Sequence, residues 1–406
     1  MKQPLSSQES MDLEAKYGAH NYHPLPVVLS RGEGIYLWNP EGKKFMDFLA
    51  GYSAVNQGHC HPKIIAALTE QAKQLTLTSR AFYNDKLGLA EKYVCEFFGY
   101  QKALFMNSGV EANETALKIT RKWAYDVKKI PVNQAKIIAV QSNFHGRTLG
   151  VISASTDSSS KTGFGPYMPG YIVVPYDDLE ALNLALEDPT VAGFWVEPIQ
   201  GEAGVVVPSK GYLKKASELC RKNNVLLLAD EIQTGIGRTG KLLACEYENV
   251  KPDILILGKS LSGGTMPISV VLTQDSVMDV IKPGSHGSTF GGNPLAAHVV
   301  IAALNTVHDE KLVENSHLRG EQFRKELAHL KKLPFVKDIR GLGLMNAIEI
   351  ENSPKRSAWD ICMKLMEAGL LAKPTHETTI RLTPPLVISE KQMSEACSII
   401  SAVFSS

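Results

Sequence analysis

The stretch Asp253-Ile-Leu-Ile-Leu-Gly-Lys259-Ser-Leu-Ser-Gly-Gly264 joins a short apolar run to a lysine and a glycine-rich turn. A second run of the same kind, Val225-Leu-Leu-Leu-Ala-Asp230, ends in an aspartate. Continuous apolar runs of this length are typical of parallel strands that are buried on both faces of a sheet. Ligands of such sheets bind at the carboxyl ends of the strands. We therefore expect Lys259 and Asp230 to lie close together in a ligand site.

Apolar runs of strand length alternate with helical patterns between about residues 100 and 275. The helical patterns include Glu111–Val127 and Tyr212–Asn223. This alternation predicts an α/β domain whose mostly parallel, seven-stranded sheet is covered by helices on both faces. The candidate strands are Ala103–Met106, Lys136–Val140, Tyr171–Val174, Gly193–Val196, Val225–Ala229, Ile254–Leu257 and Ile268–Leu272.

The rest of the chain divides around this sheet. Residues 1–52 are predicted to form an extended N-terminal segment with a hairpin at Gly34–Gly42. Residues 53–310 form the large domain that contains the expected sheet. Residues 311–406 begin with a long charged helical pattern, Lys311–Lys332, and continue in short strands. This last part predicts a smaller C-terminal α+β domain.

Length and composition narrow the class of protein. The 406 residues carry a net charge of +1, which gives no electrostatic reason to expect nucleic acid or membrane partners. The six cysteines are scattered without a Cys-x-x-Cys pair, which favours free thiols. His59-Cys60-His61 offers adjacent ligands but no second pair, so we expect no metal site there. The polar N-terminal stretch has no arginine before Arg31 and is unlike a targeting leader, which predicts a cytosolic protein.

A lysine and an aspartate at neighbouring strand ends are the two groups that a pyridoxal phosphate enzyme requires. The amine of Lys259 can bond covalently to the aldehyde of the cofactor. The carboxylate of Asp230 can keep the pyridine nitrogen protonated, so that the ring withdraws electrons. The sequence therefore predicts pyridoxal 5'-phosphate as the cofactor.

Two loops of small residues could hold the phosphate group. Asn107-Ser108-Gly109-Val110-Glu111 follows a candidate strand, and Ser108 with Glu111 spells a capping box. A capping box alone explains these residues, but a helix N-terminus also presents free amides to an anion. The hydroxyls of Gly287-Ser288-Thr289-Phe290-Gly-Gly-Asn-Pro294 also suit a phosphate, with an interdomain turn as the alternative. Lys259 and Asp230 in the same sheet favour the phosphate interpretation of the first loop.

Gly235-Ile-Gly237-Arg-Thr-Gly240 matches the G-x-G-x-x-G fingerprint of dinucleotide-binding proteins. That fingerprint should open a helix directly after its strand and precede an acidic residue at the end of the next strand. Here Asp230–Thr234 separates the strand from the first glycine, and Asp253 begins the next strand instead of ending it. We interpret the motif as a turn. An NAD-dependent dehydrogenase is the competing hypothesis that rests on it.

Two other strand ends carry groups that could contact a cofactor or a substrate. Phe144 could stack on an aromatic cofactor or pack in the core, and Arg147 could hold a carboxylate or be a surface charge. His145 between them is more often structural than a general base, for which Lys259 is the better candidate. Glu197 and Glu202 place two carboxylates after a buried strand, which indicates a site when other reactive groups lie in the same sheet.

These stretches together resemble the class III, pyridoxal phosphate-dependent aminotransferases of fold type I. The resemblance covers nearly the whole chain, and the motifs occur in the order of the family. One departure is His145, where some relatives carry tryptophan. The motifs are Asn107–Ala112, Phe144–Thr148, Glu197–Glu202, Asp230–Gly240, Leu257–Gly264 and Gly287–Pro294.

The resemblance implies roles for residues around the cofactor. Lys259 would hold pyridoxal phosphate and move a proton, and Asp230 would pair with the pyridinium nitrogen. Ser288 and Thr289 would come from a neighbouring subunit, which implies a homodimer with active sites at the interface. The cofactor-binding residues would be Ser108, Gly109, Val110, Phe144, His145, Asp230, Ile232, Gln233, Lys259, Ser288 and Thr289.

Two further stretches, Tyr17–Leu25 and Tyr52–Pro62, narrow the resemblance within the family. They imply L-ornithine and 2-oxoglutarate as substrates, with transfer of the δ-amine. The rival family members are the acetylornithine and 4-aminobutyrate aminotransferases, against which Tyr22 and Tyr52 argue. A non-catalytic binding protein that keeps the fold is the remaining alternative.

The resemblance also implies how the δ-amine is selected over the α-amine. Tyr22 and Arg147 would hold the α-carboxylate of ornithine. Glu202 would pair with Arg381 and mask it, since a free Arg381 would attract that carboxylate and present the wrong amine. The substrate-binding residues would be Tyr22, Tyr52, Arg147, Glu197, Glu202 and Arg381.

Overall fold

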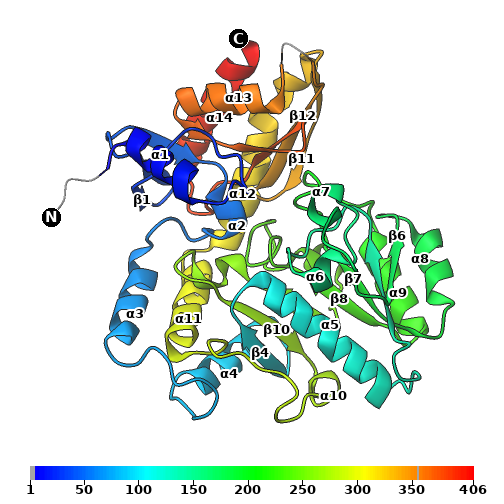
Figure 1. Cartoon of the computed structure of the whole chain (residues 1–406). Coiled ribbons are helices and arrows are strands. Elements are labelled where there is room, and N and C mark those ends of the chain that lie inside the picture. The colour runs from blue at the N-terminus through cyan, green and yellow to red at the C-terminus, as the bar shows by residue number, and fades with distance from the viewer. Residues whose placement is uncertain (1–4, 354–355) are drawn as a thin grey trace.

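The computed structural model describes residues 5–353 and 356–406 and contains three β-sheets (Figure 1). The central sheet comprises β4 (Lys102–Met106), β5 (Lys136–Val140), β6 (Tyr171–Val174), β7 (Val191–Val196), β8 (Leu226–Asp230), β9 (Ile254–Leu257) and β10 (Ser269–Thr273). Its order is β4-β10-β9-β8-β7-β5-β6. Only β10 runs opposite to the other strands of this sheet, since it pairs antiparallel with both β4 and β9, and the pairs from β6 to β9 are parallel. The predicted seven-stranded, mostly parallel sheet is confirmed.

Both faces of the central sheet are buried, which explains why its strands are continuous apolar runs. Ile137 packs in the core that includes α5 (Gly109–Asp126), and Ile138 packs in the core under α8 (Leu179–Leu186) and α9 (Tyr212–Lys222). Alternate residues of a strand point to opposite faces, so both must be apolar when helices cover both sides. Figure 1 shows α5 on one side of the sheet and α8 with α9 on the other.

Two smaller sheets lie beside the central one. The first holds β1 (Arg31–Glu33), β2 (Tyr36–Trp38), β3 (Lys44–Asp47) and β13 (Leu370–Leu371), in this order. The second is antiparallel and holds β11 (Val336–Leu342), β12 (Met345–Ile350), β15 (Thr379–Leu382) and β14 (Lys373–Thr375). Because β13 pairs in parallel with β3, the N-terminal segment shares a sheet with C-terminal residues. The domain boundaries at residues 52 and 310 stay predictions.

The long helix expected over Lys311–Lys332 is wrong in its extent. Helix α12 (Leu312–Glu326) ends six residues earlier, and a 3₁₀ turn, η3 (Ala328–Lys332), follows it. Leu327 and Leu330 are both buried, and three residues per turn place them on the same face. The other helical elements are α1 (Ser7–Tyr17), α2 (Ala50–Ser53), α3 (Pro62–Ala72), α4 (Leu87–Phe98), α6 (Leu149–Ile152), α7 (Ser158–Lys161), η1 (Ala244–Glu248), η2 (Lys259–Ser262), α10 (Asp275–Met278), α11 (Pro294–Asp309), α13 (Ala358–Glu367) and α14 (Glu390–Ser405).

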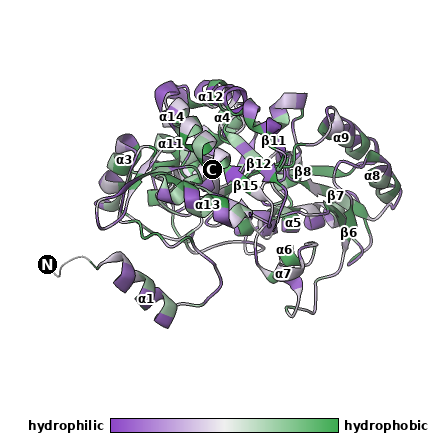
Figure 2. Ribbon diagram, turned by 90° about the horizontal axis from the view of Figure 1, so that it is seen from above, coloured by the Kyte–Doolittle hydropathy of each residue, from purple (hydrophilic) through white to green (hydrophobic). Residues whose placement is uncertain are grey.

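The hydropathy of the residues agrees with this arrangement of buried strands and outer helices. Figure 2 shows hydrophobic residues along the strands of the central sheet and hydrophilic residues on the outer helices. Helix α1 lies apart from the body and has no buried residue. Within the described ranges, no helix is long and apolar enough to cross a membrane, and no group of metal-ligating side chains was found.

Candidate active site

Lys259, Asp230 and Glu197 come together at the carboxyl ends of three neighbouring strands, β9, β8 and β7. All three line one cavity of about 340 Å³. The structure thus brings Lys259 and Asp230 to one site, as the parallel strands predict. The other residues that line the cavity are Gly109, Val110, Asn113, Phe144, His145, Gly146, Arg147, Ile199, Ile232, Gln233 and Thr234.

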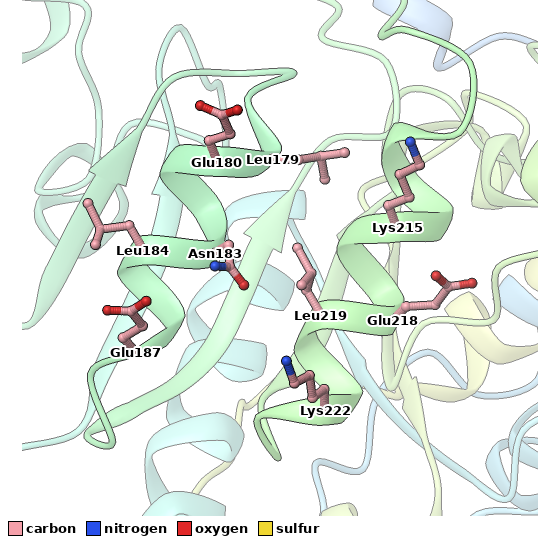
Figure 3. Close-up of a pocket in the computed structure, with 9 residues that line it drawn as sticks. All are labelled: Leu179, Glu180, Asn183, Leu184, Glu187, Lys215, Glu218, Leu219 and Lys222. Atoms are coloured by element: carbon pink, nitrogen blue, oxygen red, sulfur yellow. The ribbon is translucent and has the colours of Figure 1, made fainter.

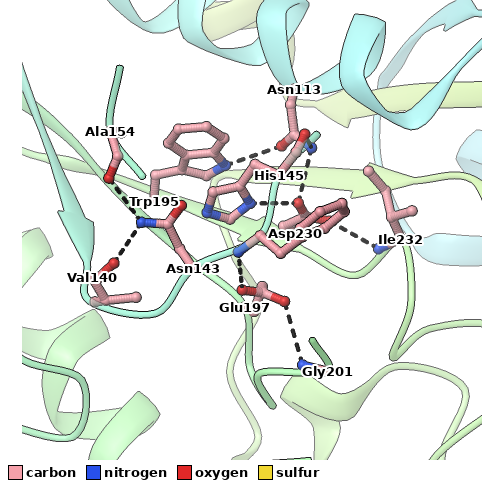
Figure 4. Close-up of polar contacts among 11 residues, drawn as sticks. Asn113, Val140, Asn143, His145, Ala154, Trp195, Glu197, Gly201, Asp230 and Ile232 are labelled. Atoms are coloured by element: carbon pink, nitrogen blue, oxygen red, sulfur yellow. Dashed lines mark hydrogen bonds and ion pairs between the residues drawn. The ribbon is translucent and has the colours of Figure 1, made fainter. Parts of the chain in front are cut away.

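The buried carboxylate of Asp230 accepts three hydrogen bonds (Figure 4). The Nδ1 of His145 donates to Oδ2 at 2.6 Å, and the Nδ2 of Asn113 donates to the same oxygen at 2.9 Å. The backbone amide of Ile232 donates to Oδ1 at 3.1 Å. An ionised carboxylate can only accept, which assigns the hydrogen to Nδ1 of His145. Three donors on two oxygens hold the carboxylate in one orientation.

Two residues that the sequence analysis missed, Asn113 and Trp195, complete this network (Figure 4). The indole Nε1 of Trp195 donates to Oδ1 of Asn113 at 3.0 Å, which fixes the direction of the Asn113 amide. Trp195 also stacks on the imidazole of His145, with ring centroids 3.7 Å apart. His145 therefore lies between Trp195 and Asp230 and orients the carboxylate through its hydrogen bond. The expected contact of His145 with the cofactor ring stays a prediction. The one sequence signal for Asn113 is a polar residue on the apolar face of the helix.

Lys259 begins the turn η2 with a left-handed φ of 46°. Such a backbone is uncommon for a residue with a side chain and occurs preferentially at functional sites. Burial lowers the pKa of the Lys259 amine, and the charges of Glu202 and Asp230 offset part of this effect. A lowered pKa increases the share of neutral amine, which is the form that attacks a carbonyl carbon.

The two carboxylates that follow β7 have pKa values shifted in opposite directions. Burial raises the pKa of Glu197 well above its ordinary value, and the charge of Asp230 adds to this effect. Burial also acts to raise the pKa of Glu202, but the charges of Arg381 and Lys259, together with hydrogen bonds from Arg381 and Gln233, lower this pKa overall. Glu197 therefore favours the protonated form and Glu202 the charged form.

Glu202 pairs with Arg381, which projects from β15. The Nη1 of Arg381 lies 2.5 Å from Oε1 of Glu202. The guanidinium also lies over the ring of Tyr52, 4.8 Å from its centroid. The side chain of Gln233 is close by and donates through Nε2 to the backbone oxygen of Tyr52 at 3.4 Å. Arg381 is thus a buried cation that is neutralised by one carboxylate and covered by one aromatic ring.

The N-terminus of α5 forms another wall of the cavity. The backbone amide of Glu111 donates to Oγ of Ser108 at 3.3 Å, and the Glu111 carboxylate accepts from the backbone amide of Ser108 at 2.7 Å. This is the capping box expected from the sequence. Gly109 and Val110 follow, at positions whose amides have no acceptor within the helix. An anion in the cavity would meet these amides and the positive end of the helix dipole.

Two expected substrate-binding residues do not meet in this structure. Arg147 lines the cavity of Lys259, but its Nη1 pairs with Asp157 at 3.3 Å. Tyr22 is 76% exposed and lines a separate cavity of about 460 Å³, together with Tyr52. The shared grip of Tyr22 and Arg147 on a carboxylate stays a prediction.

The second candidate phosphate loop, which contains Ser288 and Thr289, contacts the segment before α5 in the same chain. The Oγ of Ser288 accepts from Nδ2 of Asn107 at 2.9 Å in the same chain. Asn107 directly precedes the capping residue Ser108, so this loop adjoins the N-terminus of α5. The role of Ser288 and Thr289 at a neighbouring subunit's cofactor stays a prediction.

The turn Gly235–Gly240 has no features of a dinucleotide site. No helix opens within this stretch, all of which is described, and it is packed tightly against the C-terminal part. A Cβ at Gly237 would lie 3.1 Å from Leu386, and a Cβ at Gly240 would lie 3.0 Å from Cα of His317. The glycines therefore allow close packing of the chain, which leaves no room for a pyrophosphate.

A third cavity, of about 590 Å³, lies between α8 and α9 (Figure 3). Its lining side chains are spread along the two helices and do not converge on one point. They lie far from the strand ends that carry Lys259 and Asp230, so we interpret this cavity as a solvated groove. The lining residues are Leu179, Glu180, Asn183, Leu184, Glu187, Lys215, Glu218, Leu219 and Lys222.

The cavity lined by Lys259 and Asp230 offers a partner for each reactive group of pyridoxal phosphate. The amine of Lys259 suits the aldehyde, the carboxylate of Asp230 suits a protonated pyridine nitrogen, and the start of α5 suits the phosphate. Space at the phosphate end depends on glycine, since a Cβ at Gly109 would lie 3.0 Å from the side chain of Ile232. The fold and this site define a pyridoxal phosphate-dependent enzyme of the α/β class.

Comparison with known proteins gives the family. The profile of the family described as "Aminotransferase class-III" matches residues 17–404, and the chain therefore belongs to this family. Class III aminotransferases use pyridoxal phosphate, which confirms the predicted cofactor. The chain is 61% identical to a protein named mitochondrial ornithine aminotransferase from Drosophila melanogaster, over 95% of this chain and 89% of that protein.

Solved structures are similar over the whole chain. The ornithine aminotransferase from Toxoplasma gondii has a TM-score of 0.97 at 50% identity, covering 99% of this chain and 96% of that one. The acetylornithine aminotransferase from Elizabethkingia anophelis has a TM-score of 0.90 at 54% identity, covering 99% of both chains. These likenesses agree with the predicted fold type I architecture.

The predicted cytosolic location is wrong. It rested on the polar composition of the first residues and on the position of the first arginine, Arg31. The Drosophila relative, which is 61% identical over 95% of this chain, is named as a mitochondrial protein. Composition near the start of a chain does not determine where the folded protein works.

Proposed function

We propose that this protein transfers the δ-amine of L-ornithine to 2-oxoglutarate, giving glutamate 5-semialdehyde and glutamate. The semialdehyde cyclises to pyrroline-5-carboxylate. The observation that carries the proposal is the buried ion pair of Glu202 and Arg381 beside Tyr52 and Lys259. Relatives of 61% and 50% identity that are named ornithine aminotransferases support it.

When bound, pyridoxal phosphate supplies an aldehyde that carries the amino group and a ring that withdraws electrons. Lys259 would hold it and move a proton between substrate and cofactor, and its lowered pKa suits both tasks. Asp230, fixed by its three donors, would face the pyridine nitrogen. Phe144 and Ile232 would lie on the two faces of the ring, and Gln233 would bond its hydroxyl group. Ser108, Gly109 and Val110 would bind the phosphate.

Selection of the amine follows from the state of Arg381. While Glu202 neutralises Arg381, no free positive charge attracts the carboxylate of ornithine to the site beside Lys259. The carboxylate instead binds at Tyr22 and Arg147. The δ-amine then reaches the reactive centre. When 2-oxoglutarate replaces the first product, Glu202 moves aside and Arg381 binds the carboxylate beside the keto group. A charge pair of this kind contributes about 1–3 kcal/mol to discrimination.

The protein is proposed to work as a homodimer with active sites at the subunit interface. Large apolar side chains are exposed near the loop of Ser288 and Thr289: Phe290 is 56% exposed and Phe82 is 74% exposed. The segments of these two residues adjoin, since a Cβ at Gly292 would lie 3.0 Å from Leu87 and 3.5 Å from Arg80. Exposed apolar surface of this kind is typical of an interface.

The experiment that tests the function is a visible absorption spectrum of the purified holoenzyme, recorded before and after adding L-ornithine without a keto acid. We expect a yellow protein whose band disappears on addition of L-ornithine and returns with 2-oxoglutarate. A yellow protein that ignores L-ornithine would keep the cofactor and exclude this substrate. A protein that stays colourless with added pyridoxal phosphate would contradict the cofactor as well.

Tyr22→Ile is expected to lower kcat/KM for L-ornithine by about 10–100-fold, the cost of removing a hydrogen bond to a charged group. Shorter ω-amines such as 4-aminobutyrate, which have no α-carboxylate at that distance, should be spared. The measurement is the ratio of the two kcat/KM values. Tyr17→Ile, at another exposed tyrosine of the same segment, is the control. An unchanged ratio in Tyr22→Ile would exclude the proposed grip on the α-carboxylate.

Acetylornithine transfer is the second candidate, because a structure of 54% identity carries that name. The spectrum distinguishes the two functions when N-acetylornithine is compared with L-ornithine at equal concentration. N-acetylornithine has no free α-amine, so an enzyme for it does not need to mask Arg381 against the wrong amine. A faster loss of the yellow band with N-acetylornithine would favour this second function.

A further inference from the structure

The turn that carries Tyr52 has a left-handed backbone over four consecutive residues. Ala50, Gly51, Tyr52 and Ser53 have φ values of 48°, 57°, 59° and 72°. This geometry is unfavourable for every residue with a side chain, and only one of the four is glycine. A chain keeps such a turn only where the surrounding contacts hold it in place.

Asp47, the last residue of β3, provides contacts at the entrance of the turn. Its Oδ1 accepts from the backbone amides of Leu49 and Ala50, at 2.8 Å and 2.9 Å. Its Oδ2 accepts from Nε2 of His59 at 2.7 Å. Asp47 is 3% exposed, so its carboxylate depends on these protein donors for solvation. The buried carboxylate therefore ties the start of the turn to His59.

His59 follows the turn in the chain, and contacts with Gly34 and Gly32 restrain its backbone and its imidazole. Its backbone exchanges hydrogen bonds with Gly34, at 2.8 Å and 3.1 Å. Its imidazole lies against Gly32, where a Cβ would approach Cβ of His59 to 2.9 Å. The hairpin of β1 and β2 thus restricts the imidazole to a position beside Asp47. The hydrogen bond between Asp47 and His59 joins the residues on either side of the turn.

The other side of the turn faces the substrate site. The ring of Tyr52 lies under the guanidinium of Arg381, and the backbone oxygen of Tyr52 accepts from Gln233. The backbone oxygen of Leu49 accepts from Oγ1 of Thr383 at 3.1 Å, two residues after Arg381. A shift of the turn therefore changes the position of the Tyr52 ring relative to Arg381.

We propose that Asp47 and His59 are positioning residues for substrate selection, because they hold the left-handed turn that keeps Tyr52 against Arg381. This inference rests on the proposed function, since it concerns the choice among ω-amino donors. Neither residue of the pair needs to contact the substrate. The pair acts through Tyr52, which lines the wall between the cavity of Tyr22 and the site of Arg381.

The test compares His59→Leu with His61→Leu in the full-length holoenzyme. His61 belongs to the same stretch and also pairs with a carboxylate, Glu310 at 3.2 Å, but has no contact with the turn among the described hydrogen bonds and ion pairs. We measure kcat/KM for L-ornithine and for 4-aminobutyrate. His59→Leu is expected to lower the ratio of the two values about 10-fold or more, whereas His61→Leu should leave the ratio within about 2-fold of wild type.

A double-mutant cycle separates positioning from a general loss of structure. If His59 acts through Tyr52, adding His59→Leu to Tyr52→Ile should change the substrate ratio by less than about 2-fold. His59→Gln, whose amide can still donate to Asp47, should restore most of the wild-type ratio and serves if His59→Leu folds poorly. The inference would be overturned if His59→Leu lowered kcat/KM equally for L-ornithine and 4-aminobutyrate. It would also be overturned if the effects of His59→Leu and Tyr52→Ile on the substrate ratio were additive in the double variant.

Amide hydrogen exchange of residues 48–55 gives a readout without any substrate. Exchange there is expected to be at least about 10-fold faster in His59→Leu than in wild type and unchanged in His61→Leu. A wild-type protein that does not use L-ornithine overturns the proposed function and this inference with it. A wild-type protein that uses L-ornithine, combined with an unchanged ratio in His59→Leu, overturns the inference alone.

Discussion

Replacing Lys259 with alanine is expected to lower kcat for amine transfer by at least about 10⁴-fold, the upper end of what one acid–base group contributes. By the proposed roles of Lys259, the variant would lose both covalent attachment of the cofactor and the group that moves the proton. No second lysine is among the residues that line this described cavity, so no other amine takes over either task. The measurement is the steady-state rate with L-ornithine and 2-oxoglutarate.

Lys259→Arg is the matched variant for this prediction. A guanidinium keeps a positive charge beside Glu202 and Asp230, but it cannot be deprotonated in a protein and so cannot act as a base or a nucleophile. It should be as inactive as the alanine variant. Intact-mass spectrometry after borohydride reduction should find the cofactor attached to the wild type and to neither variant. Normal turnover in Lys259→Ala would contradict the proposed role of Lys259, whereas a wild type without turnover would favour a non-catalytic binding protein.

Asp230→Asn is expected to lower kcat by about 10²–10³-fold, because it removes the buried charge that we propose faces the pyridine nitrogen. The asparagine also cannot accept hydrogen bonds from all three donors that surround Asp230. Its amide group must face either His145 and Asn113 or the backbone amide of Ile232, and all of these are donors. A buried unpaired donor lowers the free energy of unfolding by about 1–3 kcal/mol.

Asp253→Asn is the control that separates the two effects. Asp253 directly precedes β9, at the opposite end of the strands from Asp230, and its Oδ2 accepts from the backbone amide of Leu227 at 2.8 Å. Its replacement should lower the free energy of unfolding by about 1 kcal/mol and leave kcat within about 2-fold of wild type. Equal losses of kcat in Asp230→Asn and Asp253→Asn would show that stability, and not the charge of Asp230, determines the rate.

Much of the fold could be predicted because burial on both faces leaves a local signal. The strands of the central sheet are short apolar runs, and all seven were placed within a few residues. Helix starts were visible for a similar reason, since Ser108 with Glu111 forms its capping box within four residues. The extent of the helix after Lys311 was not visible, because the burial of Leu327 and Leu330 depends on distant elements.

The site was only partly predictable, because its supports come from separate elements. Asn113 lies on α5, His145 follows β5 and Trp195 lies on β7, yet all three orient Asp230 directly or through one contact. Asp47 and His59 were also missed as a pair, and His59 was considered only as a metal ligand. Side-chain hydrogen bonds across such distances leave no periodic pattern in the chain.

The sequence by itself determined the seven-stranded α/β sheet, the strand ends that carry Lys259 and Asp230, and the chemistry that these two groups favour. Each of these depends on contacts or patterns that are local along the chain. The family resemblance implied that Glu202 pairs with Arg381, 179 positions away, but only the tertiary structure decided how close the two groups lie and that Tyr52 covers Arg381 from a left-handed turn. The strength of an ion pair and the pKa of a buried group depend on distance and desolvation in three dimensions, which the order of residues does not contain.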